Sequence, residues 1–180
     1  MQAKEKGSTL SATFSLNNYI THLPIQDEVR EKLLNEFYEF ESKAKKWEAK
    51  GHVLDMLDVI RNEDVEDCQI ANDVAWNLAS IIGCEVFPRY YRQTKGTVLR
   101  PHKDLGTACA LNVILKGTSP ITWDEKYDVE YSCALLNVQQ THHVKNDDTR
   151  IFLKLSIFDS TYHEVVETLR GKENDIFDIN

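Results

Sequence analysis

The spacing of apolar residues changes at Gly83, and this change limits the fold more than any other feature of the sequence. Before Gly83, apolar side chains recur every three or four residues, which predicts amphipathic helices over residues 25–50 and 67–82. After it, the segments are short, rich in valine, isoleucine, phenylalanine and tyrosine, and separated by turn signals such as Thr94-Lys95-Gly96. This second pattern is typical of strands. Helices followed by strands predict an α+β domain.

The individual elements follow from the same pattern. The helical stripes are Val29, Leu33, Phe37, Phe40, Ala44 and Trp47, then Ile70, Val74, Leu78 and Ile81. Strands are predicted at residues 84–91, 97–102, 108–115, 120–124, 131–138, 141–145 and 150–158. A closing helix is predicted at 161–171, with a frayed acidic tail behind it.

The length of 180 residues suits one domain with a sizeable core. We therefore expect a single domain with three parts. Residues 1–83 are mainly helical support, 84–159 form the strand core that carries the site, and 160–180 form a helix and an acidic tail.

Composition narrows the possible partners. The formal net charge of −8 makes a nucleic-acid partner unfavourable, because a phosphate backbone would repel the chain. The sequence lacks an apolar run of about eighteen residues, so we expect no membrane span, and it lacks an N-terminal apolar stretch of the secretory kind. The four cysteines are widely spread and predict buried thiols rather than a zinc site or redox pair. Together these features predict a cytoplasmic protein.

One short motif has the chemistry of a metal site. His102 and Asp104 are two residues apart, so on an extended segment their side chains point to the same face. His142 and His143 follow forty residues later in another predicted strand. Two histidines and a carboxylate on three corners of an octahedron bind Fe(II) and leave positions open for a bidentate cosubstrate and O₂. The His-x-Asp pair alone is weak evidence, because it would also suit a simple hydrogen-bonded surface pair.

The last predicted strand adds two cations to this picture. Its apolar residues Ile151 and Leu153 alternate with Arg150 and Lys154, which share the opposite face. Burying these cations would be costly without a counter-anion. A dicarboxylate with one end on the metal and the other on a guanidinium would supply that anion, since arginine binds a carboxylate through two hydrogen bonds. The structural alternative is that both side chains face solvent on an edge strand.

Taken together, the motifs resemble a known enzyme family. They are Tyr90-Tyr91, Gly96, His102-x-Asp104, residues 110–115, Leu135-Leu136-Asn137, His142-x-Val144 and Arg150. This set resembles the Fe(II)- and 2-oxoglutarate-dependent dioxygenases and is most similar to their prolyl-hydroxylase-like branch. The resemblance covers about residues 84–159. It implies a double-stranded β-helix, or jelly roll, with the N-terminal helices packed on its larger sheet.

The resemblance also implies an activity. 2-Oxoglutarate would be the cosubstrate, converted with O₂ to succinate and CO₂ at Fe(II). The product would be a hydroxylated substrate, because Asp104 keeps the carboxylate that related halogenases replace. The prime substrate is expected to be a peptidyl, prolyl-type group or a small molecule. The alternatives are a non-catalytic, cupin-like sensing protein that binds a metal or ligand, and a cupin-type metal enzyme that does not use 2-oxoglutarate.

Site roles follow from the family pattern. A ligand histidine, any residue and then valine favours His142 as the third ligand beside His102 and Asp104, with His143 as the alternative. Arg150, eight residues after His142, matches the residue that anchors 2-oxoglutarate.

Other residues could also hold the cosubstrate. Lys154 could replace or assist Arg150, because a lysine is the anchor in some collagen-type prolyl hydroxylases. Tyr90, Tyr91 and Asn112 are weaker candidates, each of which could equally be an ordinary sheet residue.

Overall fold

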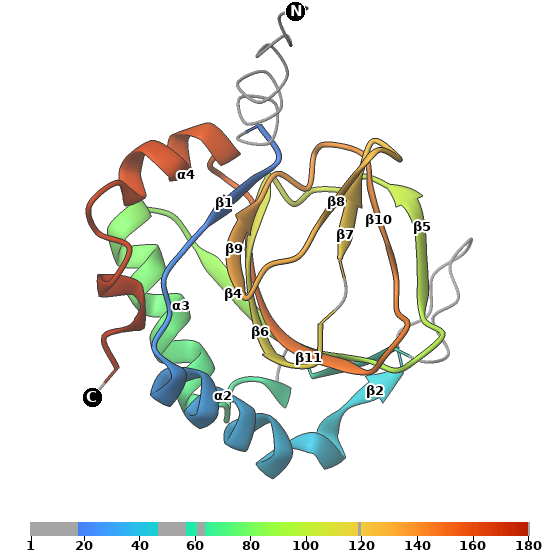
Figure 1. The fold of residues 1–180 in the computed structure, drawn as a ribbon. Coiled ribbons are helices and arrows are strands. Elements are labelled where there is room, and N and C mark those ends of the chain that lie inside the picture. Colours follow the sequence, from blue (N-terminus) through green and yellow to red (C-terminus); the bar gives the residue numbers. More distant parts are fainter. Residues whose placement is uncertain (1–17, 47–56, 61–63, 119, 180) are drawn as a thin grey trace, which may run out of the picture.

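The computed structural model describes residues 18–46, 57–60, 64–118 and 120–179. These residues form two antiparallel sheets and three α-helices, an α+β sandwich (Figure 1). The larger sheet has the order β1-β9-β6-β11-β4-β3-β2 and the smaller one β5-β10-β7-β8. No helix in the described part of the chain is long and apolar enough to cross a membrane.

The strand bounds fit most of the predicted segments. The larger sheet contains β1 (Ile20–His22), β2 (Lys45–Lys46), β3 (Leu57–Ile60), β4 (Val86–Gln93), β6 (Cys109–Lys116), β9 (Cys133–Leu136) and β11 (Arg150–Ile157). The smaller sheet contains β5 (Val98–His102), β7 (Ile121–Trp123), β8 (Tyr127–Val129) and β10 (His142–Lys145). The patterns did not predict β1, β2, β3 or β8, which are two to four residues long and too short for a clear alternation.

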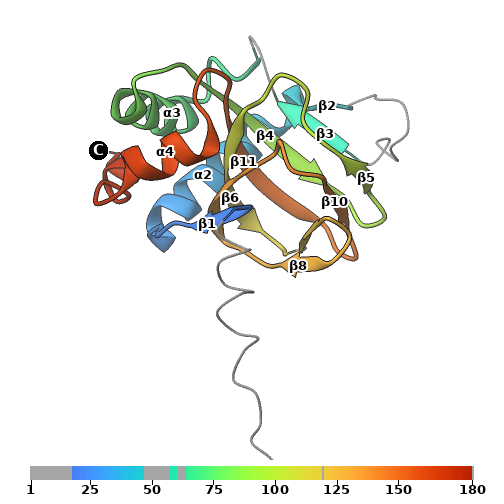
Figure 2. The same cartoon turned by 90° about the horizontal axis from the view of Figure 1, so that it is seen from above.

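Strands β4 to β11 divide between the two sheets in a regular way. The chain alternates between the sheets, except that β7 and the adjoining β8 are both in the smaller one. The helices α2 (Asp27–Glu39), α3 (Gln69–Ile82) and α4 (Tyr162–Leu169) all lie on the outer side of the larger sheet (Figure 2). This arrangement leaves the space between the sheets to side chains of the inner faces.

Strand β11 has the alternation that the sequence predicts. Leu153 and Leu155 are fully buried in the core between the larger sheet and the helices. Phe152 belongs instead to the second core, between the sheets, where its ring stacks on Tyr91 with centroids 5.0 Å apart. The inner face of β11 therefore also carries Arg150 and Lys154, as the alternation predicts. The alternative, in which both side chains face solvent on an edge strand, is wrong because β11 is paired on both sides.

The first predicted helix and the predicted frayed tail both differ in the structure. The first helix ends at Glu39, and a 3-10 turn over Glu41–Lys43 leads into β2. The periodic pattern continues beyond this point, but Lys45 and Lys46 pair with β3, so sheet pairing overrides helix propensity. Trp47 and the rest of the predicted helix lie outside the described residues. The C-terminal tail is ordered as far as the structure describes it, up to Ile179, because Ile176 and Phe177 are buried in a 3-10 turn over Asp175–Phe177.

The start of α3 has a cap that comes from another helix. Cys68 at its N-cap makes no side-chain capping bond. Glu36 of α2 supplies the missing cap. Its buried carboxylate accepts hydrogen bonds from the backbone N–H groups of Ile70 (2.6 Å) and Ala71 (2.9 Å). The hydroxyl of Tyr90 on β4 donates a third bond of 2.6 Å. One carboxylate thus ties two helices to the larger sheet and faces the positive end of the α3 dipole.

Helix α4 has a local capping box, which gives a first prediction. The Thr161 hydroxyl accepts from the backbone N–H of Glu164, and the Glu164 carboxylate accepts from the backbone N–H of Thr161. We expect Thr161→Ala to lower the free energy of unfolding by about 1 kcal/mol, because an N–H at the helix start loses its acceptor. Chemical denaturation measures this effect. Thr161→Ser keeps the hydroxyl and should be close to wild type, and equal losses in both variants would contradict the capping role.

Candidate metal centre

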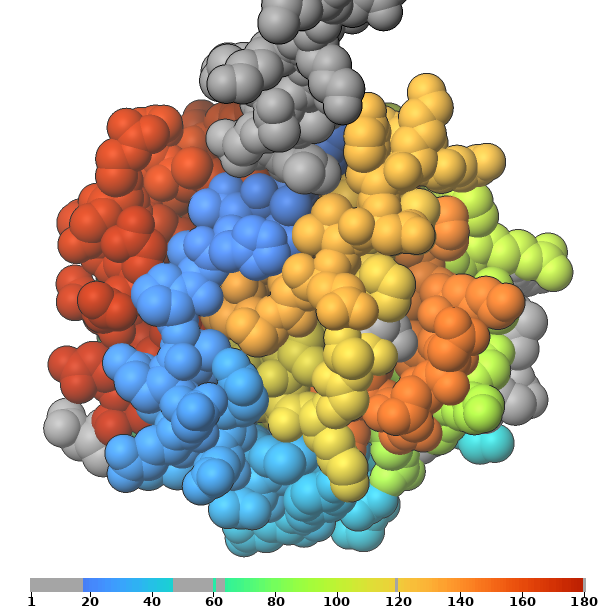
Figure 3. Space-filling model, in the orientation of Figure 1, coloured from blue at the N-terminus to red at the C-terminus, as the bar shows by residue number. Residues whose placement is uncertain are grey.

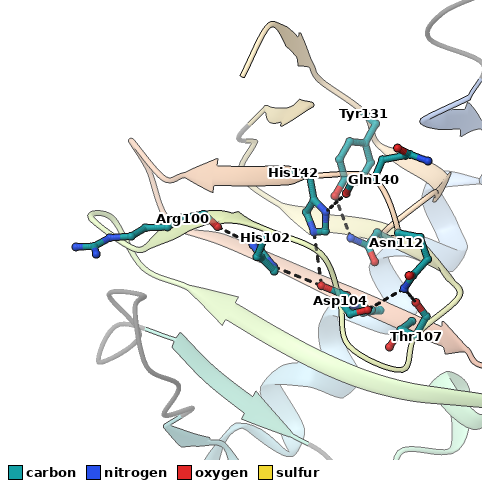
Figure 4. Close-up of polar contacts among 10 residues, drawn as sticks. Arg100, His102, Asp104, Thr107, Asn112, Tyr131, Gln140 and His142 are labelled. Atoms are coloured by element: carbon teal, nitrogen blue, oxygen red, sulfur yellow. Dashed lines mark hydrogen bonds and ion pairs between the residues drawn. The ribbon is translucent and has the colours of Figure 1, made fainter. Parts of the chain in front are cut away.

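The structure brings His102, Asp104 and His142 together between the two sheets. One ligand atom from each residue lies within 4.8 Å of the other two (Figure 4). His102 is the last residue of β5, Asp104 lies in the following loop, and His142 is the first residue of β10. Residues forty positions apart meet because β5 and β10 are antiparallel neighbours in which His102 and His142 are direct partners. This group could hold a metal ion.

Both imidazoles have the orientation that metal binding needs. Nδ1 of His102 lies 2.7 Å from the carbonyl oxygen of Arg100, and Nδ1 of His142 lies 3.0 Å from that of Gln140. A carbonyl can only accept a hydrogen bond, so each Nδ1 carries the proton and the neutral ring leaves its Nε2 lone pair available. The two Nε2 atoms lie 3.3 and 3.6 Å from Oδ1 of Asp104. Backbone carbonyls behind the rings are a common support for metal-binding histidines.

His143 lies outside this group. Its strand partner is Thr122, whereas His142 pairs with Trp123 and its ring lies 5.2 Å from the indole. Successive residues of a strand face opposite sides of the sheet, so His143 points away from the side on which His142 meets Asp104. Of the two candidates for the third ligand position, the structure places His142 in the cluster.

The loop that carries Asp104 is fixed by residues behind it. The backbone N–H of Asp104 donates to the carbonyl of Val138 (3.0 Å). The Gln139 side chain donates to the carbonyls of Asp104 (2.8 Å) and Thr107 (2.5 Å). These bonds hold the carboxylate between the two histidines. Gln139 carries no sequence signal that would have marked it for this role.

Lys154 contacts the other oxygen of the same carboxylate. Its Nζ donates to Oδ2 of Asp104 at 2.5 Å, and the lysine and aspartate side chains are only 17% and 16% exposed. Burial opposes the charge on Lys154, but the Asp104 carboxylate outweighs it and raises the pKa of the lysine. Burial likewise opposes ionisation of Asp104, yet Lys154 and His102 keep the pKa of this carboxyl well below its usual range. The carboxylate is therefore ionised and available to a cation through Oδ1.

The two histidines differ in how they titrate. Burial lowers the pKa of His142 to about 4, so its imidazole is neutral near pH 7. Burial also acts to lower the pKa of His102, but its hydrogen bond with Asp104 outweighs this and raises the value overall. An imidazole binds a metal only in its neutral form, so neither histidine brings a negative charge to the ion. The negative charge that a divalent cation requires comes from the Asp104 carboxylate.

Arg150 lies between the sheets and is more buried than Lys154, with only 2% of the residue exposed. Its Nε donates to the side-chain carbonyl of Gln93, and its guanidinium lies over the Phe152 ring, 4.8 Å from the centroid. Burial lowers the pKa of Arg150, and a hydrogen bond with Tyr131 counteracts this. The Tyr131 hydroxyl also accepts from the side-chain amide of Asn112 (3.0 Å). Gln93 and Tyr131 belong to this polar group, although the sequence did not single them out.

The other predicted cosubstrate residues have different surroundings. Tyr91 stacks on Phe152, between Arg150 and Lys154 on the neighbouring strand. The side-chain oxygen of Asn112 is buried and has no hydrogen-bond partner in the described structure. Tyr90 faces the helices, where its hydroxyl binds Glu36, and it is therefore a structural residue.

The surface also has a pocket away from the histidines. It has a volume of about 630 Å³ and lies between β1, α2 and the end of β6, on the face seen in Figure 3. Its lining includes His22, Arg30, Lys116 and Tyr131, and none of the three clustered residues. Tyr131 connects this pocket to the polar group around Arg150.

Comparisons with known proteins give a fold and no family assignment. No protein-family model and no curated protein matches the sequence. Among solved structures, HygX from Streptomyces hygroscopicus, with nickel, 2-oxoglutarate and hygromycin B bound, has a TM-score of 0.55 and 11% identity, covering 82% of this chain and 86% of HygX. A prolyl-4-hydroxylase from Pseudomonas putida has a TM-score of 0.52 and 12% identity, covering 81% and 96%. The chain therefore has the fold seen in these two proteins.

Proposed function

We propose that this protein is an Fe(II)- and 2-oxoglutarate-dependent oxygenase that hydroxylates a peptidyl or small-molecule substrate. The observation that carries the proposal is the arrangement of two Nε2 atoms and one carboxylate oxygen from His102, His142 and Asp104. This donor set fits Fe(II), which binds two imidazoles and a carboxylate on one face and keeps the opposite positions open. Iron bound there would supply O₂ activation. The chain itself orients the ligands, through Gln139, Lys154 and backbone carbonyls.

The fold supports the same proposal. Strands β4 to β11 form two four-stranded layers, β9-β6-β11-β4 and β5-β10-β7-β8, through which the chain alternates. We assign this order to a jelly roll, with β1, β2 and β3 extending the larger sheet and the helices supporting it. The structure of HygX was determined with nickel and 2-oxoglutarate bound, which is the ligand chemistry proposed here. Apart from the exposed β2, these elements contribute residues to the two cores described above, so we propose a single domain.

Of the two cations on β11, we propose Arg150 as the cosubstrate anchor. The ammonium of Lys154 already contacts Asp104, so it lies beside the metal position rather than at the far end of a chelating dicarboxylate. Arg150 is four residues earlier on the same face, about 13 Å along the strand, and its long side chain can reach part of the way back. Its planar guanidinium can bind a carboxylate through two hydrogen bonds. Asn112 and Tyr91 lie close enough in the sheet to border the same space.

A substitution pair tests this assignment. We expect Arg150→Gln to weaken 2-oxoglutarate binding by roughly tenfold to hundredfold, because a charge-assisted pair is lost. Lys154→Gln should leave that affinity closer to wild type and instead disturb metal binding. Calorimetric titration of the Mn(II)-loaded protein with 2-oxoglutarate measures the affinity, and succinate formation with and without Fe(II) measures turnover. At Mn(II) concentrations that saturate both variants, a larger loss of affinity in Lys154→Gln would make the lysine the anchor.

A further inference from the structure

A second cation lies next to Lys154 on the inner face of the larger sheet. Arg89 on β4 is the direct strand partner of Lys154 on β11. Alternate residues of a strand share a face, so Arg89 lies on the same face as Tyr91 and Gln93, which belong to the space between the sheets. Direct partners on neighbouring strands have Cβ atoms about 5 Å apart. Arg89 is therefore close to the lysine that touches Asp104.

Arg89 differs from the other cations of the site because it has no bonded partner among the residues that the structure describes. Lys154 is paired with Asp104, and Arg150 with Gln93. On the outer face of β4, the neighbouring Arg92 forms an ion pair with Glu41. Within the described part of the protein, the half-buried Arg89 makes no hydrogen bond, ion pair or ring contact.

Two like charges at direct partner positions repel each other, which disfavours the pair unless an anion lies nearby. Asp104 can neutralise one of them, but a divalent metal would share the charge of that carboxylate. The surroundings of Lys154 and Arg89 would then be positive, although the whole chain carries a net charge of −8. Such local positive charge favours an anionic ligand.

An apolar surface adjoins Arg89 on the same strand. Phe87 precedes it by two residues, is 44% exposed and packs edge-on against Phe158, with ring centroids 5.3 Å apart. An exposed phenylalanine that packs on a half-buried one beside a guanidinium suits a molecule that has both an apolar body and an acidic group.

We propose that Arg89 binds an anionic group, a carboxylate or a phosphate, of a prime substrate whose apolar body lies against Phe87 and Phe158. The inference rests on the proposed oxygenase function and names the chemistry of its substrate. Arg89 thereby determines specificity: it selects acids over neutral molecules of the same shape, and it leaves the metal and 2-oxoglutarate to the residues described above.

Three small probes test the inference by binding alone. Phenyl phosphate and phenylacetate carry the acidic group, and phenylacetamide is the neutral analogue. Each is titrated into protein loaded with Zn(II) and N-oxalylglycine, an unreactive mimic of 2-oxoglutarate, and followed by calorimetry or ligand-observed NMR. The proteins are wild type, Arg89→Gln and the matched control Lys145→Gln, which removes an exposed cation of β10. The two acids distinguish a carboxylate site from a phosphate site.

In wild type, at least one acid should bind about tenfold more tightly than the amide, because it gains a charge-assisted hydrogen bond. Arg89→Gln should lose this preference, whereas Lys145→Gln should keep it. Equal affinity for acid and amide in wild type, no binding of either acid, or an unchanged preference in Arg89→Gln would each overturn the inference. Binding of N-oxalylglycine to the Zn(II)-loaded wild type is measured first. If it fails, the oxygenase proposal fails; if it succeeds without an acid preference, only the role of Arg89 fails.

Discussion

Replacing His142 by alanine is expected to abolish binding of a divalent metal and all 2-oxoglutarate turnover. The substitution removes one of the two imidazoles of the proposed metal site and leaves one histidine and one carboxylate. Removing a residue that merely supports a ligand typically costs about 10–100-fold in metal affinity. Loss of the ligand itself should therefore cost more than about a hundredfold. Titration with Mn(II) measures the affinity, and succinate formation in the presence of Fe(II) measures the turnover.

His143 provides a matched control for this experiment. It is the adjacent histidine of the same strand, with its side chain on the opposite face. His143→Ala should bind Mn(II) and turn over 2-oxoglutarate as the wild type does. If His143→Ala lost metal binding while His142→Ala kept it, the third ligand would be assigned wrongly. If neither variant changed metal binding, the site itself would be wrong.

The second large effect concerns stability rather than chemistry. Replacing Glu36 by alanine should lower the free energy of unfolding by about 3 kcal/mol or more. The N–H groups of Ile70 and Ala71 and the hydroxyl of Tyr90 would all lose their acceptor inside the protein. A buried donor left unsatisfied costs about 1–3 kcal/mol. The favourable charge at the start of α3 would also be lost.

Urea unfolding followed by circular dichroism measures this loss, with two controls. Glu39→Ala changes an exposed glutamate of the same helix and should alter stability by less than about 0.5 kcal/mol. Glu36→Gln keeps the shape and one carbonyl acceptor, so it should lie between Glu39→Ala and Glu36→Ala. Equal stabilities of Glu36→Ala and Glu39→Ala would show that the carboxylate does not hold the two helices and the sheet together.

Part of the site can be predicted from the sequence because the direction of a side chain along a strand or helix depends only on residues close to it in the chain. The alternation along β11 gives the inner positions of Arg150 and Lys154. The two-residue spacing of His102 and Asp104 predicts that the two side chains meet, although only His102 lies on a strand and the loop after β5 positions Asp104. The alternation of β11 survives folding because β11 lies in the middle of a sheet, between β4 and β6. The apolar stripes of α2 and α3 are local patterns as well, and their residues are buried in the core between the helices and the larger sheet.

Contacts between distant segments could not be predicted in this way. The bond from Lys154 to Asp104 joins residues fifty positions apart, and that from Tyr90 to Glu36 joins residues fifty-four apart. Both depend on which strands become neighbours, and a single sequence does not contain that information. The same applies to Arg89, whose position beside Lys154 follows only from the pairing of β4 with β11.

The end of the first helix shows the opposite problem, since a local pattern there gives the wrong answer. The apolar period continues through Phe40 and Ala44, yet the chain leaves the helix after Glu39. Pairing of Lys45 and Lys46 with β3 decides the conformation. A helical period predicts a helix only where no strand competes for the same backbone groups.

The most direct test of the central claim is an anaerobic titration of the Fe(II)-loaded protein with 2-oxoglutarate, followed by visible absorption. Chelation of Fe(II) by a 2-oxo acid gives a charge-transfer band that neither component shows alone. We expect this band to saturate with a single equivalent of iron in wild type and in His143→Ala, and to be absent in His142→Ala. If wild type bound no Fe(II), or gave no band with saturating 2-oxoglutarate, the proposed metal and cosubstrate site would be contradicted.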